Sequence, residues 1–248
     1  MTDLPRVAVL GSLVSVCDRQ GALAAVEQRI AAGGGGYVCF TNAHTTVMGR
    51  QDRRFRDVTN GSLLSAADGK PVYWVARLRS PLPVGHVPGP DFFHYALTQR
   101  PERRHFLYGS TPETLQALRR ALEAQIPGLE FCGVYSPPFR ALTEADKAQH
   151  VQMIRESGAE FVWVGLGAPK QELWMAELSG ALAPAVLFGV GAAFDFYSGK
   201  VRRAPPLMRW LGLEWLHRLC QEPGRLWKRY LVTNALFFVY FVKDLFGS

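Results

Sequence analysis

Two short apolar runs, each ending in a glycine-rich turn, limit the possible folds of this chain more than any other feature. Phe161–Gly165 continues as LGAPKQELW, and Ala185–Gly189 continues as VGAAFDF. Glycine lets backbone N–H groups approach an anionic ligand closely, and the start of a helix presents further unpaired N–H groups. The first turn leads into a predicted helix whose first residues are PKQE. Together the two turns predict a ligand-binding crevice at one edge of a sheet.

Predicted strands alternate with predicted helices through the first 199 residues. The predicted strands are Val7–Leu10, Tyr37–Thr41, Phe106–Gly109, Glu130–Val134, Phe161–Gly165 and Ala185–Gly189. The predicted helices are Leu23–Ala32, Thr45–Asp57, Thr111–Gln125, Glu144–Ser157 and Lys170–Ser179. This alternation predicts an α/β catalytic domain over residues 1–199, with a doubly wound, largely parallel, Rossmann-like sheet. Ligands of such sheets bind beyond the carboxyl ends of the strands, where the glycine turns lie.

Residues 200–248 differ from this body in charge and in pattern. They hold nine of the 28 Lys and Arg residues but only three of the 21 Asp and Glu residues. Four apolar residues fall on one helical face, namely Met208, Leu211, Trp215 and Leu219. Pro223 begins a second helix with the uncharged run Tyr230–Val242, which is shorter than the ~20 apolar residues that span a bilayer. We therefore predict a basic, amphipathic helical appendage that docks on an anionic membrane surface. The alternatives are a hairpin packed on the body and a contact in a homo-oligomer.

The cysteines and histidines argue against a disulfide framework and against a metal site. The four cysteines lack CxxC spacing, and the six histidines lack HExxH or other ligand spacing. The cysteines are Cys17, Cys39, Cys132 and Cys220. Reduced, buried thiols and the lack of a visible secretory signal at Met1–Arg6 predict a cytoplasmic location. No metal ion and no cofactor is predicted.

The glycine turns and the basic tail resemble the WecG/TagA/CpsF family of bacterial glycosyltransferases. The family carries similar LGAPKQE and GVG-AFD-F-G-K-RAP segments and a GLEW–RL–EP–R tail, matched here between Leu166 and Arg225. Upstream, the resemblance includes Asn42–Ala43, Ala67–Gly69, Gly89–Asp91 and Tyr135–Phe139. It extends from about Tyr37 to Tyr230. It implies transfer of a sugar from a UDP-sugar donor to a sugar on a polyprenyl-diphosphate carrier, in cell-surface polysaccharide or exopolysaccharide biosynthesis.

Asp68 is the candidate catalytic residue. It follows the apolar run Leu63–Ala67 and precedes Gly69. From the residues alone, Asp-Gly is either an ordinary turn or a carboxylate at the mouth of the crevice that can take a proton from an attacking hydroxyl. The resemblance implies the second role, because the aspartate of the matching motif is the family's proposed general base.

Asn42 and His86 are candidate substrate-binding residues. Asn42 ends a predicted strand, where it either points into the crevice or caps the following helix. The family often has threonine two residues before this asparagine; here that residue is Phe40, and Thr41 is adjacent to Asn42. His86 stands where family members often have arginine, and imidazole is a weaker phosphate clamp than guanidinium.

The remaining substrate-binding candidates lie at helix starts, in the glycine turns and in the tail. Thr111 is predicted to cap a helix, so Gly109 and Ser110 either bind a nucleotide phosphate or simply precede a helix start. Gln171 suits sugar hydroxyls or faces solvent, and Asp195 binds ribose or sugar or fixes its own loop. The resemblance implies that three tail arginines close over the diphosphates: Arg218, Arg225 and Arg229. The set also includes Asp91, Gly167, Lys170 and Gly191.

The resemblance implies a glycosyltransferase, which we predict to be inverting. The chain has no DxD motif to hold a divalent cation, so the enzyme is predicted to be metal-independent. An oxidoreductase is disfavoured, since Gly189–Phe194 has Phe194 at the third glycine position of the dinucleotide fingerprint. A non-catalytic, membrane-associated protein that binds nucleotide sugars or acts as a scaffold is the alternative. Nucleic-acid binding is not predicted, because the basic tail lacks a recognised reading module.

Overall fold

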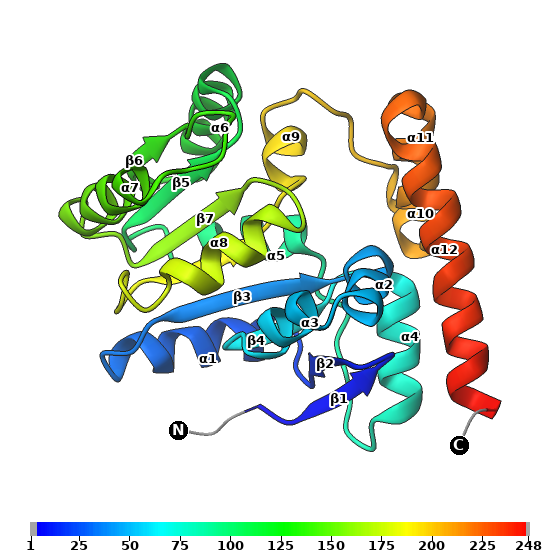
Figure 1. The fold of residues 1–248 in the computed structure, drawn as a ribbon. Coiled ribbons are helices and arrows are strands. Elements are labelled where there is room, and N and C mark those ends of the chain that lie inside the picture. Colours follow the sequence, from blue (N-terminus) through cyan, green and yellow to red (C-terminus); the bar gives the residue numbers. More distant parts are fainter. Residues whose placement is uncertain (1–3, 247–248) are drawn as a thin grey trace.

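Six parallel strands form the centre of the molecule (Figure 1). The computed structural model describes residues 4–246, except for the side chains of Arg225 and Arg229. The strand order is β4-β3-β8-β7-β5-β6. The strands are β3 (Gly36–Thr41), β4 (Leu64–Ala67), β5 (His105–Gly109), β6 (Phe131–Tyr135), β7 (Phe161–Gly165) and β8 (Val186–Gly189). The predicted α/β fold with a doubly wound parallel sheet is confirmed.

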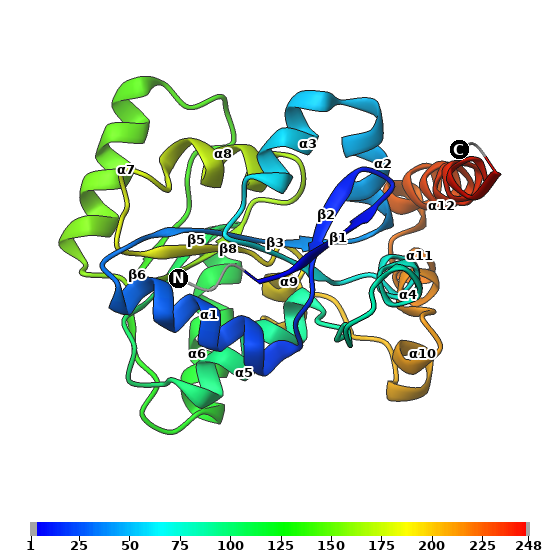
Figure 2. The same cartoon turned by 90° about the horizontal axis from the view of Figure 1, so that it is seen from below.

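Helices cover both faces of this sheet (Figure 2). One face carries α1 (Arg19–Ala31), α5 (Gly89–Gln99), α6 (Pro112–Gln125) and α9 (Ala193–Tyr197). The other face carries α3 (Arg53–Asn60), α7 (Glu144–Glu156) and α8 (Lys170–Leu178). Strand β7 shows why both faces are covered, because its side chains alternate between two apolar cores. Phe161 and Trp163 belong to the first core, whereas Val162 and Val164 belong to the second.

A third apolar cluster lies beside β4. It joins β1 (Arg6–Val9), β2 (Ser12–Ser15), α2 (Ala43–Gln51) and α4 (Lys70–Arg79). The predicted strand Val7–Leu10 was expected in the parallel sheet, and this is wrong. It corresponds to β1, which pairs antiparallel with β2 in a separate two-stranded sheet.

Two predicted helices are broken in the structure. The predicted helix Thr45–Asp57 divides into α2 and α3, because the Asp52 side chain accepts hydrogen bonds from Arg54 N and Phe55 N and so begins a new helix. The single helical face predicted over residues 208–219 is also wrong. That segment forms α10 (Pro206–Trp210) and α11 (Glu214–Gln221), separated at Gly212, whose φ of 77° lies in the left-handed region.

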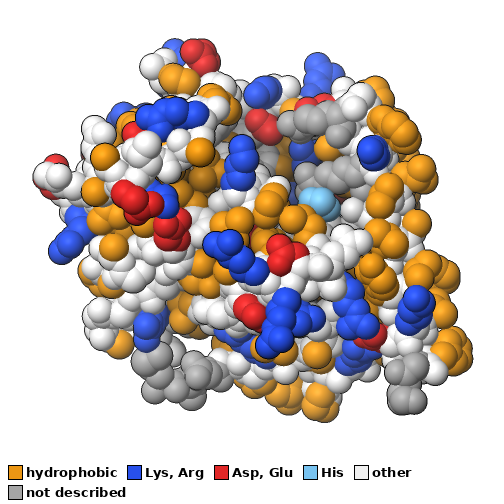
Figure 3. Space-filling model, in the orientation of Figure 1, with side chains coloured by type: hydrophobic (Ala, Val, Ile, Leu, Met, Phe, Trp, Pro, Cys, Tyr) orange, Lys and Arg blue, Asp and Glu red, His pale blue; other side chains and the backbone are white. Residues whose placement is uncertain are grey.

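The C-terminal helices lie beyond the carboxyl ends of the strands (Figure 1). The last of them, α12 (Pro223–Phe246), packs against the third cluster through Phe237, and its Asp244 lies 3.5 Å from Arg50 and 3.8 Å from Arg79. Many apolar side chains of these helices are exposed, and Figure 3 shows them along the C-terminal edge. Within residues 4–246, no helix is long and apolar enough to cross a bilayer. Cys220 is exposed, so the prediction of a buried thiol is wrong at this position.

Candidate active site

A cavity of about 1020 Å³ lies at the carboxyl ends of the strands. Its walls come from the ends of β3 and β4, the glycine turns after β7 and β8, the first turns of α4, and helices α10 to α12. Nine of the predicted site residues line it: Asn42, Asp68, His86, Ser110, Gly167, Gln171, Gly191, Asp195 and Arg218. The parallel pairing explains this assembly, because it places the carboxyl ends of neighbouring strands at one edge.

Four predicted site residues lie outside the cavity wall: Thr41, Asp91, Gly109 and Lys170. Thr41 is buried, and its hydroxyl hydrogen-bonds to Ser65 on β4. Gly109 has a φ of 116°, and a Cβ there would lie 2.7 Å from the carbonyl of Gly165, so glycine is required by the close approach of two backbones. The side chains of Arg225 and Arg229 lie outside the described residues.

Asp68 follows β4 directly and points into the cavity. The pairing of Thr41 with Ala67 puts the turns after β3 and β4 side by side. Asp68 Oδ1 accepts a hydrogen bond from Gly89 N at 2.8 Å, and Oδ2 accepts one from Asn42 Nδ2 at 3.1 Å. Burial nevertheless raises the pKa of Asp68 to about 6, against the lowering effect of these two hydrogen bonds. Asp68 is therefore held in a fixed position with a pKa suited to accepting a proton near neutral pH.

Asn42 both caps the following helix and points toward the cavity. Its Oδ1 caps α2 by accepting hydrogen bonds from His44 N and Thr45 N, and Thr45 completes a capping box. Its Nδ2 donates to Asp68. The cap fixes the orientation of the amide, so that the donor points at the carboxylate.

His86 contacts the backbone of Asp68. Its Nε2 lies 2.7 Å from the Asp68 carbonyl oxygen, and because a carbonyl only accepts, Nε2 carries the hydrogen. Burial, with a further contribution from the charge of Lys70, lowers the pKa of His86 to about 4. His86 is therefore a neutral imidazole at pH 7, and it anchors the turn that carries the carboxylate.

Gln171 joins the two glycine turns. The side chain is buried, so the solvent-facing alternative is wrong. Its Nε2 donates to Gly189 O at 2.9 Å, and its Oε1 accepts from Gly167 N at 3.2 Å. Both ends of the amide are therefore engaged with the backbone of the turns that form the cavity floor.

Among the described residues, four cationic side chains line the cavity: Lys70, Lys200, Arg209 and Arg218. Lys200 lies 3.8 Å from Asp195, and the Arg218 guanidinium lies 5.3 Å from the ring centroid of Phe196. The Nε atoms of Arg209 and Arg218 are buried and have no hydrogen-bond partner among the described residues. Buried guanidinium donors without a partner fit an anionic ligand.

An ion-pair network ties the tail to the body beside this cavity. Arg203 Nη1 lies 2.5 Å from Asp91 Oδ1, and Arg203 Nε lies 3.2 Å from Glu214 Oε1. Asp91 also lies 3.7 Å from Arg209. Asp91 thus ties the loop before α10 and α10 itself to the body, and Arg203 ties the start of α11 to that loop. Arg209 and Glu214 also line the cavity.

Several cavity residues were not predicted from the sequence, including Lys70, Trp74 and Arg209. A signal for the first two was present, because Pro71 in the first turn is typical of a helix start and marks α4. Arg209 carried no such signal, since its position depends on the break at Gly212. Among residues 4–246, no group of three or more His, Cys, Asp or Glu side chains could hold a metal ion.

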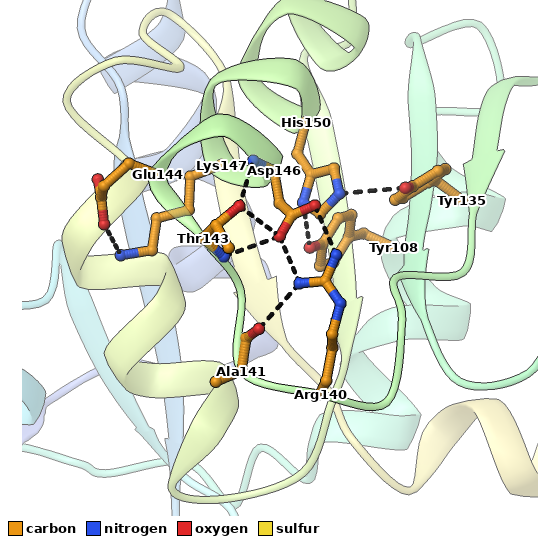
Figure 4. Close-up of polar contacts among 9 residues, drawn as sticks. All are labelled: Tyr108, Tyr135, Arg140, Ala141, Thr143, Glu144, Asp146, Lys147 and His150. Atoms are coloured by element: carbon orange, nitrogen blue, oxygen red, sulfur yellow. Dashed lines mark hydrogen bonds and ion pairs between the residues drawn. The ribbon is translucent and has the colours of Figure 1, made fainter.

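A second polar cluster, here called the α7 cluster, lies around the start of α7 (Figure 4). Asp146 accepts hydrogen bonds from both Nη atoms of Arg140, at 2.6 and 3.0 Å, and from the backbone and side chain of Thr143. These partners, Arg140 first, hold the pKa of Asp146 well below its usual range. His150 bridges Tyr108 and Tyr135 at 3.0 and 3.1 Å. None of these residues lines the cavity.

Comparisons with known proteins agree with one another. A family model described as the glycosyl transferase WecG/TagA/CpsF family matches residues 7–248. A curated relative is the N-acetylglucosaminyldiphosphoundecaprenol N-acetyl-beta-D-mannosaminyltransferase of Bacillus subtilis (strain 168). It is 29% identical over 208 residues, which cover 83% of this chain and 77% of the relative.

Proposed function

The chain belongs to the WecG/TagA/CpsF family of glycosyl transferases, and from that premise we propose that it moves a sugar from a UDP-sugar to a polyprenyl-diphosphate-linked sugar. The activity named for the relative supports the acceptor class, because that enzyme uses a sugar linked to undecaprenol through a diphosphate. The product is a lipid-linked disaccharide for cell-surface polysaccharide biosynthesis.

Asp68 is the proposed general base of an inverting displacement. An acceptor hydroxyl oxygen attacks the anomeric carbon of the donor while the bond from that carbon to the UDP oxygen breaks. The hydroxyl proton passes to the Asp68 carboxylate, and UDP leaves with the bonding electron pair. The observation that carries this proposal is the partly buried carboxylate with a pKa of about 6, held by Gly89 and Asn42 at the cavity wall.

The cationic side chains are proposed to stabilise the departing diphosphate without a divalent cation. Lys70, Arg209 and Arg218 line the same cavity as Asp68. Positive groups fixed beforehand near the developing charge lower the barrier to its separation. The predicted clamp of Arg218, Arg225 and Arg229 is part of this proposal, although only Arg218 has a described side chain.

The exposed apolar side chains of the tail are proposed to dock on the cytoplasmic face of a membrane, as in a peripheral protein. Leu207, Trp210, Trp227 and Leu231 are exposed large apolar residues of α10 and α12. They occur in the segment that holds the excess of positive charge. A basic segment with exposed tryptophan and leucine suits the interface of anionic lipids.

Release of UDP from a panel of UDP-sugars, in EDTA and with or without lipid-linked acceptor, tests this function. We expect release from one donor that depends on the acceptor, and inversion of the anomeric centre in the product. Donor binding without release from any donor would favour the non-catalytic alternative. Loss of turnover in EDTA, restored by a divalent cation, would contradict the metal-independent mechanism while leaving the transferase activity in place.

A further inference from the structure

The cavity has an apolar part that the nucleotide and the transferred sugar do not need. Away from Asp68, its walls are Pro71, Trp74, Val75 and Leu78 of α4 and Phe237, Phe238 and Phe241 of α12. Three of these side chains are largely uncovered by the described chain: Trp74 is 54% exposed, Leu78 is 71% exposed and Phe238 is 66% exposed. These walls form a groove between α4 and α12, here called the α4–α12 groove. Apart from the indole N–H of Trp74, these side chains offer sugar hydroxyls and phosphates no hydrogen-bond partner.

The side chains that line the cavity change from charged to apolar along α4. Asp68 precedes the helix, Lys70 is in its first turn, and Trp74 and Leu78 follow at intervals of four residues on the same face. At a rise of ~1.5 Å per residue, Lys70 and Leu78 are separated by about 12 Å along the helix axis. The cavity therefore runs from a carboxylate, past a cation, to an apolar wall.

The turn between α10 and α11 closes over the boundary between the polar and apolar parts. A Cβ at Gly212 would lie 3.0 Å from Lys70 and 3.6 Å from Trp74. This turn connects the helix of Arg209 to the helix of Arg218, and both arginines line the cavity. Positive charge is thus gathered where the apolar groove begins.

We propose that the α4–α12 groove holds the first isoprene units of the lipid-linked acceptor, an inference that rests on the proposed function. Such an acceptor has a sugar hydroxyl, a diphosphate and a hydrocarbon chain in that order. The cavity offers a base, cations and an apolar groove in the same order. The order of groups in the acceptor matches the order of groups in the cavity when the hydrocarbon leaves the active site between α4 and α12. Burial favours binding by about fourfold for each methylene removed from water.

The test uses acceptors that differ only in their hydrocarbon, without vesicles or detergent. N-acetylglucosaminyl diphosphate esters of methanol and of farnesol are compared in the full-length protein, with the donor that supports transfer to the undecaprenyl acceptor. For the wild type we expect a KM for the farnesyl ester at least tenfold below that for the methyl ester. In the Trp74→Ser, Leu78→Ser double variant we expect the ratio of the two KM values to fall toward one.

Leu82→Ser is the matched control, because Leu82 is an exposed apolar residue just beyond α4 that does not line the cavity. It should keep the preference for farnesyl. Equal KM values for both esters in the wild type, or an equal loss in the Leu82 variant, would overturn the groove while leaving the transferase function intact. If no acceptor at all is turned over, the proposed function has failed. The groove is then tested by calorimetric binding of farnesyl diphosphate to the wild type and to the double variant. An equal Kd for the two proteins overturns the groove.

Discussion

Asp68 and Asp146 are both aspartates near the start of a helix, yet their surroundings shift the carboxyl pKa in opposite directions. Asp146 is partly exposed and accepts hydrogen bonds from Arg140 and Thr143, which hold its pKa well below the usual range. Asp68 is partly exposed and accepts hydrogen bonds from two groups of the described residues, Gly89 N and Asn42 Nδ2, and desolvation raises its pKa to about 6.

The difference separates a carboxylate that serves the fold from one that serves chemistry. A carboxylate with a full set of donors stabilises its helix start and has little tendency to take a proton. A buried carboxylate with few donors makes folding less favourable at neutral pH, but it can act as a base there. Asp68 is the carboxylate that lines the cavity, whereas Asp146 does not.

The largest expected effect that tests this comparison is that of Asp68→Asn. Removing a general base lowers kcat by about 10²- to 10⁴-fold. The free energy of unfolding at pH 7 should change little. The variant removes a desolvated charge, which offsets the loss of one accepted hydrogen bond, because the Asn amide nitrogen cannot accept from Gly89 N or Asn42 Nδ2. Turnover of the lipid-linked acceptor and urea unfolding measure the two effects. Asp146→Asn is the control and should give the opposite pattern, with lower stability and nearly normal kcat. Near-normal turnover in Asp68→Asn would remove Asp68 as the base.

The contribution of each carboxylate to folding stability should change with pH in opposite directions and over different pH ranges. With Asp68 as the base, kcat/KM should fall about tenfold per pH unit below about 6. The raised pKa means that folded Asp68 binds a proton more tightly than the unfolded chain does. Its contribution to stability should therefore grow as pH falls from about 6 toward ~4, and it should vanish in Asp68→Asn.

Asp146 should behave in the reverse manner. Its lowered pKa means that its contribution is complete above ~4 and is lost as pH falls further. Unfolding curves of the wild type and of both Asn variants between pH 3 and pH 8 measure these differences. A kcat/KM that stays constant down to pH 4 would contradict the assignment of Asp68.

The sequence predicted the sheet and much of the cavity wall, because strand ends and glycine turns are local signals. Phe161–Gly165 is reproduced without change as β7, and Thr111 caps α6 as its position indicated. Strand β4 was not predicted as a strand, since the run LSAA is short and only its parallel pairing with β3 specifies it. Contacts between distant segments, such as Arg203 with Asp91, have no local signal at all.

His86 shows the same limit in the chemistry of the site. Its position in the cavity was predicted, but as a weak phosphate clamp. Burial keeps the imidazole neutral, and the hydrogen bond to the Asp68 carbonyl fixes which ring nitrogen carries the hydrogen; no sequence pattern shows either. Environment, which only the fold supplies, therefore determines what the side chain can do.

A smaller effect is expected from His86→Leu. Loss of the Nε2–H donor leaves the Asp68 carbonyl without its partner, at a cost of ~1–3 kcal/mol, and kcat should fall by about tenfold. His86→Gln keeps an N–H donor and should restore most of the rate, with an unchanged pH profile. If His86 instead acted as a cationic clamp, the Gln variant would lose as much activity as the Leu variant, and the KM for the donor would rise in both.

The smallest expected effect on catalysis is that of Thr143→Ala in the α7 cluster. Thr143 caps α7 in a capping box with Asp146, and loss of such a cap costs ~1 kcal/mol of unfolding free energy. We expect kcat within twofold of the wild type. Thr111→Ala is the matched variant, because Thr111 also caps a helix but lines the cavity, so it should lose similar stability and also raise the KM for the donor. The α7 cluster is nevertheless adjacent in sequence to Phe139, which does line the cavity. A several-fold loss of kcat in Thr143→Ala would therefore mean that this cluster sets the position of the Phe139 loop. Asp146 would then contribute to catalysis as well as to the fold, and its contrast with Asp68 would no longer hold.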